Sequence, residues 1–142
     1  MDRLLLVALV VAVAVVVALV MQRRRPAPPI NRAFAAPHQL DRADFPHPQA
    51  SRLIVVFSSS TCDACAAVWG HVSRLEDPTI GTIEVEAAAD ADLHSRYRIE
   101  AVPTTVIADS AGVIGWSKIG PLSSSELAEA LAGMSRTTSE DG

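Results

Sequence analysis

The feature that most constrains this chain is a pair of cysteines, Cys62 and Cys65, placed directly after an apolar run and a short turn of hydroxyl residues. No other cysteine occurs among the 142 residues. The apolar run, residues 53–57, is rich in β-branched side chains, which is typical of a strand that is covered on both faces. A disulfide-stapled small fold needs several bridges. The pair therefore indicates a redox-active dithiol at the start of a helix.

The rest of the chain predicts alternating strands and helices. The expected elements are a helix over residues 63–76, a strand over 82–87, a helix over 90–97, strands over 104–108 and 113–119, and a final helix that ends near Met134. Ser123 and Glu126 have the spacing of a capping box at the start of that helix. With the strand over 53–57, this order predicts an α/β domain in which helices cover a mixed sheet.

Residues 4–21 form a run of 18 apolar residues without a charge, glycine or proline. At about 1.5 Å per residue, a helix of this length covers about 27 Å, close to the roughly 30 Å hydrocarbon core of a bilayer. We therefore expect an uncleaved transmembrane anchor over residues 1–22, with residues 4–21 in contact with lipid. The alternative is a cleaved signal peptide, because Ala33-Phe34-Ala35 offers a cleavage site. That site lies well behind the run, and the run is longer than a signal core of roughly 7–15 residues.

The remaining boundaries follow from charge and composition. Arg23–Arg25 directly follow the apolar run and favour the cytoplasmic side for the rest of the chain, so we expect a single-pass protein of the cell membrane with its domain on that side. Residues 23–37, rich in proline and arginine, are expected to be a semi-rigid linker. The folded domain is expected over 38–134, with 39–45 suited to a short edge strand, and 135–142 as a flexible tail.

The charge of the chain is unevenly distributed along the sequence. Residues 1–50 hold six arginines and three aspartates, whereas residues 51–142 hold 13 acidic and six basic side chains. An acidic domain repels a phosphate backbone. Nucleic acid is therefore not an expected partner.

Three segments, in this order, resemble the thioredoxin superfamily. They are Phe57-Ser-Ser-Ser-Thr-Cys62-Asp-Ala-Cys65, Tyr97-Arg-Ile-Glu-Ala-Val-Pro103-Thr104 and Gly120-Pro-Leu-Ser123. The resemblance covers residues 53–134 and implies a thioredoxin-like three-layer sandwich with a mixed central sheet, in which the first strand and helix of the family are shortened or recast. More narrowly, the chain is similar to membrane-tethered thioredoxin-like proteins of actinobacteria.

The resemblance implies thiol–disulfide exchange. Cys62 would attack a substrate disulfide, because the unpaired amides and the dipole of a helix start stabilise its thiolate. Cys65 would then resolve the mixed disulfide. A cis peptide between Val102 and Pro103 would lie against the dithiol and let Val102 bind an extended substrate strand. The resemblance implies no cofactor and no metal, only the redox-active Cys62–Cys65 disulfide. The implied partners are protein dithiols or disulfides and an electron-exchange partner.

Three positions depart from the family pattern. Thr61 stands where the family has a tryptophan before the first cysteine. The charge of Asp63 favours the helix start but disfavours a thiolate on the neighbouring Cys62. Val56 takes the place of the family's buried aspartate, and we expect Glu84, on the neighbouring strand, to supply the missing proton acceptor.

Two other function classes stay open. The departures from the family pattern at Val56 and Thr61 favour a thioredoxin-like binding module with weak or no turnover. The other alternative is a metal site, in which His71 and His94 would complete a Cys₂His₂ set with the two cysteines. Tetrahedral zinc needs all four ligands within a small sphere, however, and these histidines are expected on different helices. The favoured prediction is an enzyme, a membrane-tethered thiol–disulfide oxidoreductase that acts on proteins.

Overall fold

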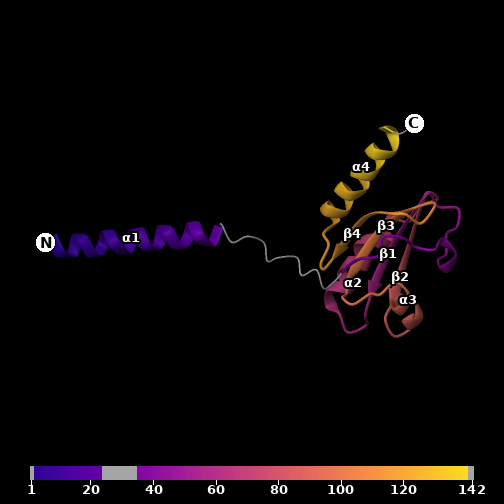
Figure 1. Ribbon diagram of the computed structural model, residues 1–142, viewed down its shortest axis with the longest axis horizontal. Helices are drawn as coiled ribbons and strands as arrows, with labels where there is room; N and C mark the ends of the chain where they lie inside the picture. The colour runs from indigo at the N-terminus through magenta and orange to yellow at the C-terminus, as the bar shows by residue number, and fades with distance from the viewer. Residues whose placement is uncertain (1, 24–34, 141–142) are drawn as a thin grey trace. The chain divides into compact units, whose positions relative to one another are not determined.

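The computed structural model describes residues 2–23 and 35–140, which belong to two separate compact units (Figure 1). The described residues of the first unit form one helix, α1 (Asp2–Arg23). The second unit contains the dithiol and all of the strands.

Helix α1 confirms the helix predicted over the apolar run. Within residues 2–23 and 35–140, however, no helix combines the length and the apolar character that crossing a membrane requires. The structure therefore confirms a helix over residues 4–21 but not the membrane span predicted there. Residues 24–34, which hold most of the predicted linker and the alternative cleavage site, lie outside the described residues.

A mixed four-stranded sheet with the order β2-β1-β3-β4 forms the centre of the second unit. The strands are β1 (Arg52–Ser58), β2 (Ile80–Glu86), β3 (Thr104–Asp109) and β4 (Ile114–Ile119). The central strand β1 pairs parallel with β2 and antiparallel with β3, and β3 pairs antiparallel with β4. The predicted mixed sheet is therefore confirmed.

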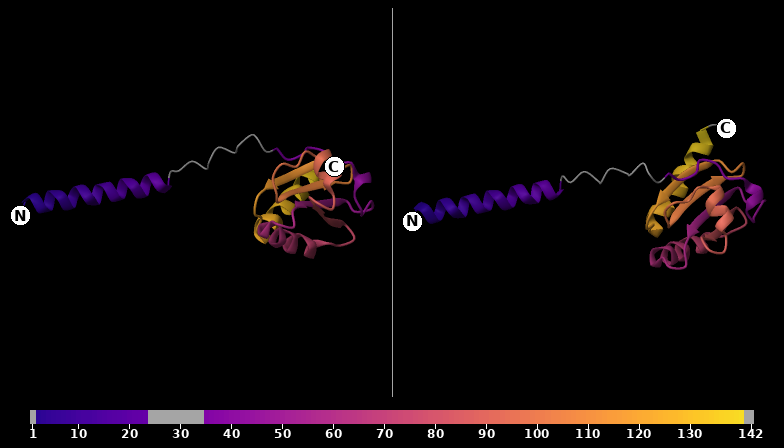
Figure 2. Two further views of the ribbon diagram at one scale, coloured as in Figure 1. Left: turned by 90° about the horizontal axis from the view of Figure 1, so that it is seen from below. Right: turned by 60° about the horizontal axis from the view of Figure 1, so that its bottom comes forward.

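Helices cover both faces of this sheet (Figure 2). The helices α2 (Asp63–Val72) and α4 (Ser124–Glu140) pack on one face, while α3 (Ala91–Arg96) and residues 36–45 cover the other. Two separate buried clusters of apolar side chains fill the two interfaces, and β1 contributes to both, as expected for a strand buried on both faces. This is the three-layer α/β sandwich that the sequence predicts.

Residues 36–45 form the segment in which the resemblance implies a shortened or recast first strand and helix. The edge strand considered for residues 39–45 is reduced to one bridge between Gln39 and Val113, followed by a 3-10 turn, Arg42–Asp44. Leu40 and Phe45 are buried in the same cluster as β1. Two buried apolar side chains and a single turn therefore cover this part of the sheet.

A polar network ties this segment to α3. Arg96 forms ion pairs with Asp41 at 3.2 Å and with Asp44 at 3.1 Å. The Tyr97 hydroxyl donates to the Asp44 carboxylate and accepts the Asp41 N–H at 3.0 Å. The network compensates for the missing backbone pairing by fixing the segment through side chains.

The final helix begins as predicted but runs further. The Glu126 N–H donates to the Ser123 hydroxyl at 3.2 Å, and the Ser123 N–H donates to the Glu126 carboxylate at 2.9 Å, which confirms the capping box. Helix α4 continues to Glu140, past its predicted end near Met134, whereas the flexible tail expected over residues 135–142 stays a prediction. The Ser135 hydroxyl accepts a 3.0 Å hydrogen bond from Arg52, which holds this turn against β1. Residues 141–142 lie outside the described residues.

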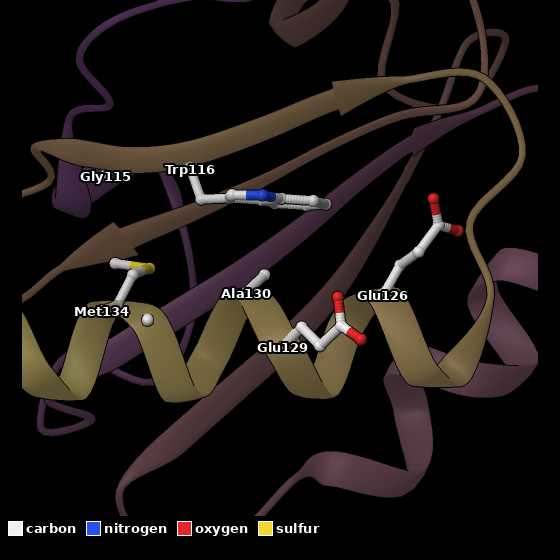
Figure 3. Close-up of a pocket in the computed structure, with 7 residues that line it drawn as sticks. Gly115, Trp116, Glu126, Glu129, Ala130 and Met134 are labelled. Atoms are coloured by element: carbon white, nitrogen blue, oxygen red, sulfur yellow. The ribbon is translucent and has the colours of Figure 1, made fainter.

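A cavity of about 440 Å³ lies between β4 and α4. Figure 3 shows the Trp116 ring between the strand and the helix, with Glu126 and Glu129 at one end of the cavity and Met134 at the other. Neither cysteine and no residue of the Pro103 loop lines it. The cavity is therefore separate from the dithiol.

Candidate active site

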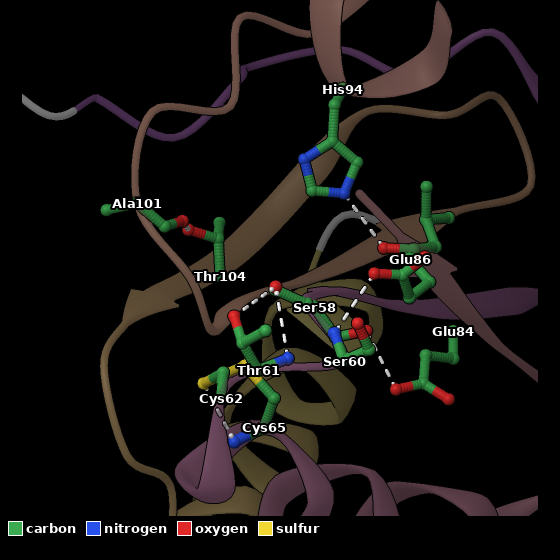
Figure 4. The surroundings of a disulfide bond; sticks show 12 residues. Ser58, Ser60, Thr61, Cys62, Cys65, Glu84, Glu86, His94, Ala101 and Thr104 are labelled. Atoms are coloured by element: carbon green, nitrogen blue, oxygen red, sulfur yellow. Dashed lines mark hydrogen bonds between the residues drawn. A yellow bond between two sulfur atoms is a disulfide. The ribbon is translucent and has the colours of Figure 1, made fainter. Parts of the chain in front are cut away.

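The two cysteines form a disulfide at the start of α2, with their Cα atoms 5.3 Å apart (Figure 4). Cys62 is the N-cap residue of the helix, and its sulfur accepts the Cys65 N–H at 3.2 Å. Cys62 is half-buried, whereas Cys65 is only 1 % exposed. A substrate therefore reaches Cys62 first, and a negative charge on that sulfur would face the Cys65 N–H at the start of the helix.

The loop between β1 and α2 consists of hydroxyl residues that bind one another. The Thr61 and Ser59 hydroxyls lie 3.1 Å apart, and the Ser59 carbonyl accepts the Cys62 N–H at 3.1 Å. Thr61 is exposed and takes the position of the family's tryptophan. Asp63, also exposed, occupies the first turn of α2. Hydrogen bonds among its own residues therefore hold part of this loop.

The peptide between Val102 and Pro103 is cis, as the resemblance implies. Thr104 pairs with Phe57 in the antiparallel register of β1 and β3. Pro103 therefore stands at the same edge of the sheet as the end of β1, from which the dithiol loop leaves. Pro103 is buried, whereas Val102, directly before it, is partly exposed.

Thr104 is a structural residue of this loop that sequence reasoning missed. Its hydroxyl donates to the Ala101 carbonyl at 2.7 Å, which closes the loop around the cis peptide. The Pro103 carbonyl accepts the Gly120 N–H at 2.8 Å, so the end of β4 supports the same loop. A hydroxyl residue directly after the proline was the available signal in the sequence.

Two polar side chains flank Val56 on the face of the sheet that α2 covers. Glu84 pairs in register with Val56 from β2, and its carboxylate accepts the Ser58 hydroxyl at 2.7 Å. Thr105 pairs in register with Val56 from β3. Thr105 is fully buried, and among the described residues its hydroxyl has no hydrogen-bond partner. The sequence singled out Glu84 but gave no signal for Thr105, because the pairing of β1 with β3 is needed to place it.

Glu86, at the end of β2, is a second carboxylate that the sequence did not single out. It accepts the Ser60 N–H at 3.0 Å and the N–H groups of Ala88 and Ala89 at 2.9 Å each. The hydrogen bond from Ala89, followed by the bond from Ser60, holds the pKa of Glu86 below its ordinary value of 4.5. One side chain therefore connects the dithiol loop with the loop that leads into α3.

The metal alternative has little support in the described residues. His94 is occupied elsewhere: its ring nitrogen donates to the Val85 carbonyl at 2.9 Å, and the ring meets Phe57 edge-on with centroids 5.5 Å apart. Within residues 2–23 and 35–140, no group of three or more His, Cys, Asp or Glu side chains is arranged to hold a metal ion. His71, in the last turn of α2, is not brought together with the dithiol and His94.

Comparison with known proteins identifies the fold. No protein-family model matches the chain, and no curated protein matches it either. Mitochondrial thioredoxin 3 from Saccharomyces cerevisiae, in its oxidised form, is similar with 19% identity and a TM-score of 0.51, over 61% of this chain and 82% of that one. Thioredoxin from Fasciola hepatica is similar with 21% identity and a TM-score of 0.52, over 60% and 82%.

A third similar chain comes from a structural study of thiol resolution in yeast mitochondrial 1-Cys peroxiredoxin via the glutathione and thioredoxin systems. It shares 16% identity with a TM-score of 0.54, over 71% of this chain and 95% of that one. At these identities the likeness establishes a thioredoxin-like fold alone. The narrower resemblance to membrane-tethered proteins of actinobacteria is not tested by it. The second unit is thus a thioredoxin-like domain with a Cys-x-x-Cys disulfide, an arrangement consistent with oxidoreductase activity.

Proposed function

We propose that this domain is a thiol–disulfide oxidoreductase that exchanges disulfides with protein substrates through Cys62 and Cys65. One observation carries the proposal: a half-buried sulfur caps helix α2 and accepts an amide hydrogen bond, while its disulfide partner is buried one turn inside. This asymmetry assigns different tasks to the two thiols. The accessible one attacks, and the protected one resolves.

The reaction balances without a further cofactor. The Cys62 thiolate attacks one sulfur of a substrate disulfide, forms a mixed disulfide, and releases the other substrate sulfur as a thiolate. The Cys65 thiolate then attacks the Cys62 sulfur and releases the second substrate thiolate. The substrate gains two electrons and two protons, and the domain is left with the Cys62–Cys65 disulfide. A dithiol partner restores the reduced state by the same steps in reverse.

The substrate class follows from the backbone before Pro103. Val102 is partly exposed at the sheet edge where the dithiol loop begins, and a cis peptide is held in place there by Thr104 and Gly120. An extended peptide aligned with Val102 would be bound by main-chain hydrogen bonds. Such binding accepts many sequences, so the proposed substrates are unfolded or extended protein segments that carry a disulfide.

Glu84 is the proposed proton acceptor for Cys65. Val56 cannot take a proton, whereas the carboxylate of Glu84 lies on the same covered face and holds the Ser58 hydroxyl. We expect Glu84→Gln to slow the resolution of a mixed disulfide, measured by stopped flow from about pH 6 to about pH 9. An unchanged rate over this range would remove Glu84 from the mechanism.

Reduction of insulin disulfides by the full chain tests the proposed function. With dithiothreitol as the electron source, the wild-type protein should accelerate the reaction, Cys62→Ser should abolish the acceleration, and Cys65→Ser should trap a mixed disulfide with insulin. The alternative, a binding module, is favoured by Val56 and Thr61. It predicts that wild-type protein and Cys62→Ser bind unfolded substrates equally and that neither reduces them.

The location of the domain stays a prediction from the sequence. It rests on the apolar run of residues 4–21 and on the arginines that follow it, which favour the cytoplasmic side of the cell membrane. A reporter fused after Gly142, of a kind active on only one side of the membrane, tests the side. Recovery of the full chain in the soluble fraction after cell lysis would contradict a membrane location altogether.

A further inference from the structure

We infer that Glu86 is a positioning residue for Cys62: it holds the dithiol loop in place and thereby sets the reactivity of the Cys62 thiolate. The inference rests on the proposed function and deepens it. No feature of the dithiol motif points to Glu86, which lies 21 residues after Cys65 on another strand. It is the hydrogen-bond pattern around its carboxylate that carries the inference.

A hydrogen bond connects Glu86 with the dithiol loop. One oxygen of the carboxylate accepts the Ser60 N–H at 3.0 Å (Figure 4). Ser60 is exposed and lies two residues before Cys62, in a loop that is otherwise held by contacts among its own hydroxyl residues. The carboxylate is thus a connection between the middle of this loop and the sheet.

The Glu86 carboxylate is itself fixed. Its other oxygen accepts the N–H groups of Ala88 and Ala89 at 2.9 Å each, and the Glu86 N–H donates to Asp90 at 3.2 Å. The backbone of β2 reaches the same point, because the Ala87 N–H donates to the Ser58 carbonyl at 3.0 Å. A carboxylate that accepts hydrogen bonds from Ser60, Ala88 and Ala89 can fix a loop, whereas a freely rotating glutamate on the surface cannot.

The loop is in turn connected with the Cys62 sulfur. Cys62 accepts an amide hydrogen bond as the N-cap of α2 only while its backbone keeps the extended conformation, with φ −111° and ψ 105°. The loop before it determines that conformation, and the Cys62 N–H is itself bound to Ser59. Release of Ser60 would let the loop and Cys62 sample other conformations. The thiolate would then lose part of its contact with the helix start.

The test compares Glu86→Ala and Glu86→Gln with wild type, with Glu129→Ala as the control for loss of an exposed glutamate charge. The readout is the rate at which iodoacetamide alkylates Cys62 in the reduced full chain, in a Cys65→Ser background, as a function of pH. We expect Glu86→Ala to be about two- to fivefold slower at neutral pH, the size of a weakened contact between an anion and a helix N-terminus. Its pH profile should move to higher pH. Glu86→Gln should lie between, because its single oxygen cannot serve both loops.

The outcomes separate this inference from the proposed function. Alkylation needs no substrate disulfide, so it reports on Cys62 even if the protein reduces nothing. Unchanged alkylation rates and pH profiles in both Glu86 variants would overturn the inference, even if melting temperatures fell. If the alkylation rates respond while wild-type protein fails to reduce insulin, Glu86 positions Cys62 and the proposed enzyme function fails. An equal slowing in Glu129→Ala would assign the effect to overall charge and would also overturn the inference.

Discussion

The two faces of strand β1 differ in the polarity of the side chains around them. On the side of α3, Leu53, Val55 and Phe57 pack into an entirely apolar and aromatic cluster. On the side of α2, Val56 lies between the polar side chains of Glu84 and Thr105, which pair with it in register. Both faces are fully buried, so exposure does not distinguish them.

The difference shows where this fold can carry chemistry. Polar groups gather on one face, at the end of the sheet from which the dithiol loop leaves, and beneath the helix that Cys62 caps. On the opposite face, Phe57 packs against the rings of His94 and Tyr97. Changes on the α3 face should therefore alter stability and leave the dithiol unaffected, whereas changes on the α2 face should alter both.

The largest effect is expected from Phe57→Ala. Phe57 is fully buried, and loss of its ring should lower the free energy of unfolding by about 3–5 kcal/mol. Because the ring faces α3, the oxidised and reduced forms should lose the same amount, measured by urea denaturation of each. Leu53→Ala, on the same face at the other end of the strand, is the control and should likewise destabilise both redox forms equally. A loss confined to one redox form would contradict the division of labour between the faces.

The second prediction places one side chain on each face in turn. Val55→Asp puts a carboxyl between Ile83 and Val106, which are apolar. Val56→Asp puts it between Glu84 and Thr105, and the Thr105 hydroxyl is free to donate a hydrogen bond to it. A buried polar group without a partner costs about 1–3 kcal/mol more than a paired one, so Val55→Asp should be less stable than Val56→Asp by that amount. Urea denaturation at equal pH measures the difference. Equal losses would show that the two faces are equally apolar in effect.

Sequence reasoning reached the fold and the dithiol because both depend on local patterns. The apolar run over 53–57 predicted a strand buried on both faces, but such a run does not say which residue points to which helix. That assignment needs the register with β2 and β3. Glu84 was found because alignment with the family placed it beside Val56, whereas Thr105 and Glu86 have no local signal. Their roles arise from pairing between strands and from bonds to loop amides.

The N-terminal part of the domain was the least predictable for the same reason. Nothing in the pattern of residues 39–45 indicates that Asp41 and Asp44 meet Arg96, more than 50 residues later. A segment that is held by side chains of distant elements has no periodicity of its own. The extension of α4 to Glu140 is a related case, because the contact of Ser135 with Arg52 is also long-range.

The third prediction concerns the polar edge of the apolar face. Tyr97→Phe removes a hydroxyl that accepts the Asp41 N–H and donates to Asp44, and it should cost about 1–2 kcal/mol. Burial, followed by the bond to Asp44, raises the pKa of Tyr97 above 10.0. Stability should therefore be complete below pH 10 and fall as the pH rises through the folded pKa, since the unfolded tyrosine ionises first. Thermal melting of wild type and variant should converge in strong alkali. An alkaline loss of the same size in Tyr97→Phe would assign it to another group.

The smallest effect, and the one with the opposite sign, is expected from Thr105→Val. Valine has nearly the shape of threonine, and the Thr105 hydroxyl is fully buried without a partner, so its removal should raise the free energy of unfolding by up to about 1 kcal/mol. Thr104→Val is the matched control, because the neighbouring hydroxyl donates to Ala101 and its loss should destabilise the Pro103 loop. If Thr105→Val instead destabilises the protein, the hydroxyl has a partner, and the α2 face is as fully satisfied as the α3 face. Thr105 and Glu84 are the two neighbours of Val56, which takes the place of the family's buried acid. If Thr105→Val changes the rate of disulfide resolution without a loss of stability, both neighbours take part in the proton transfer.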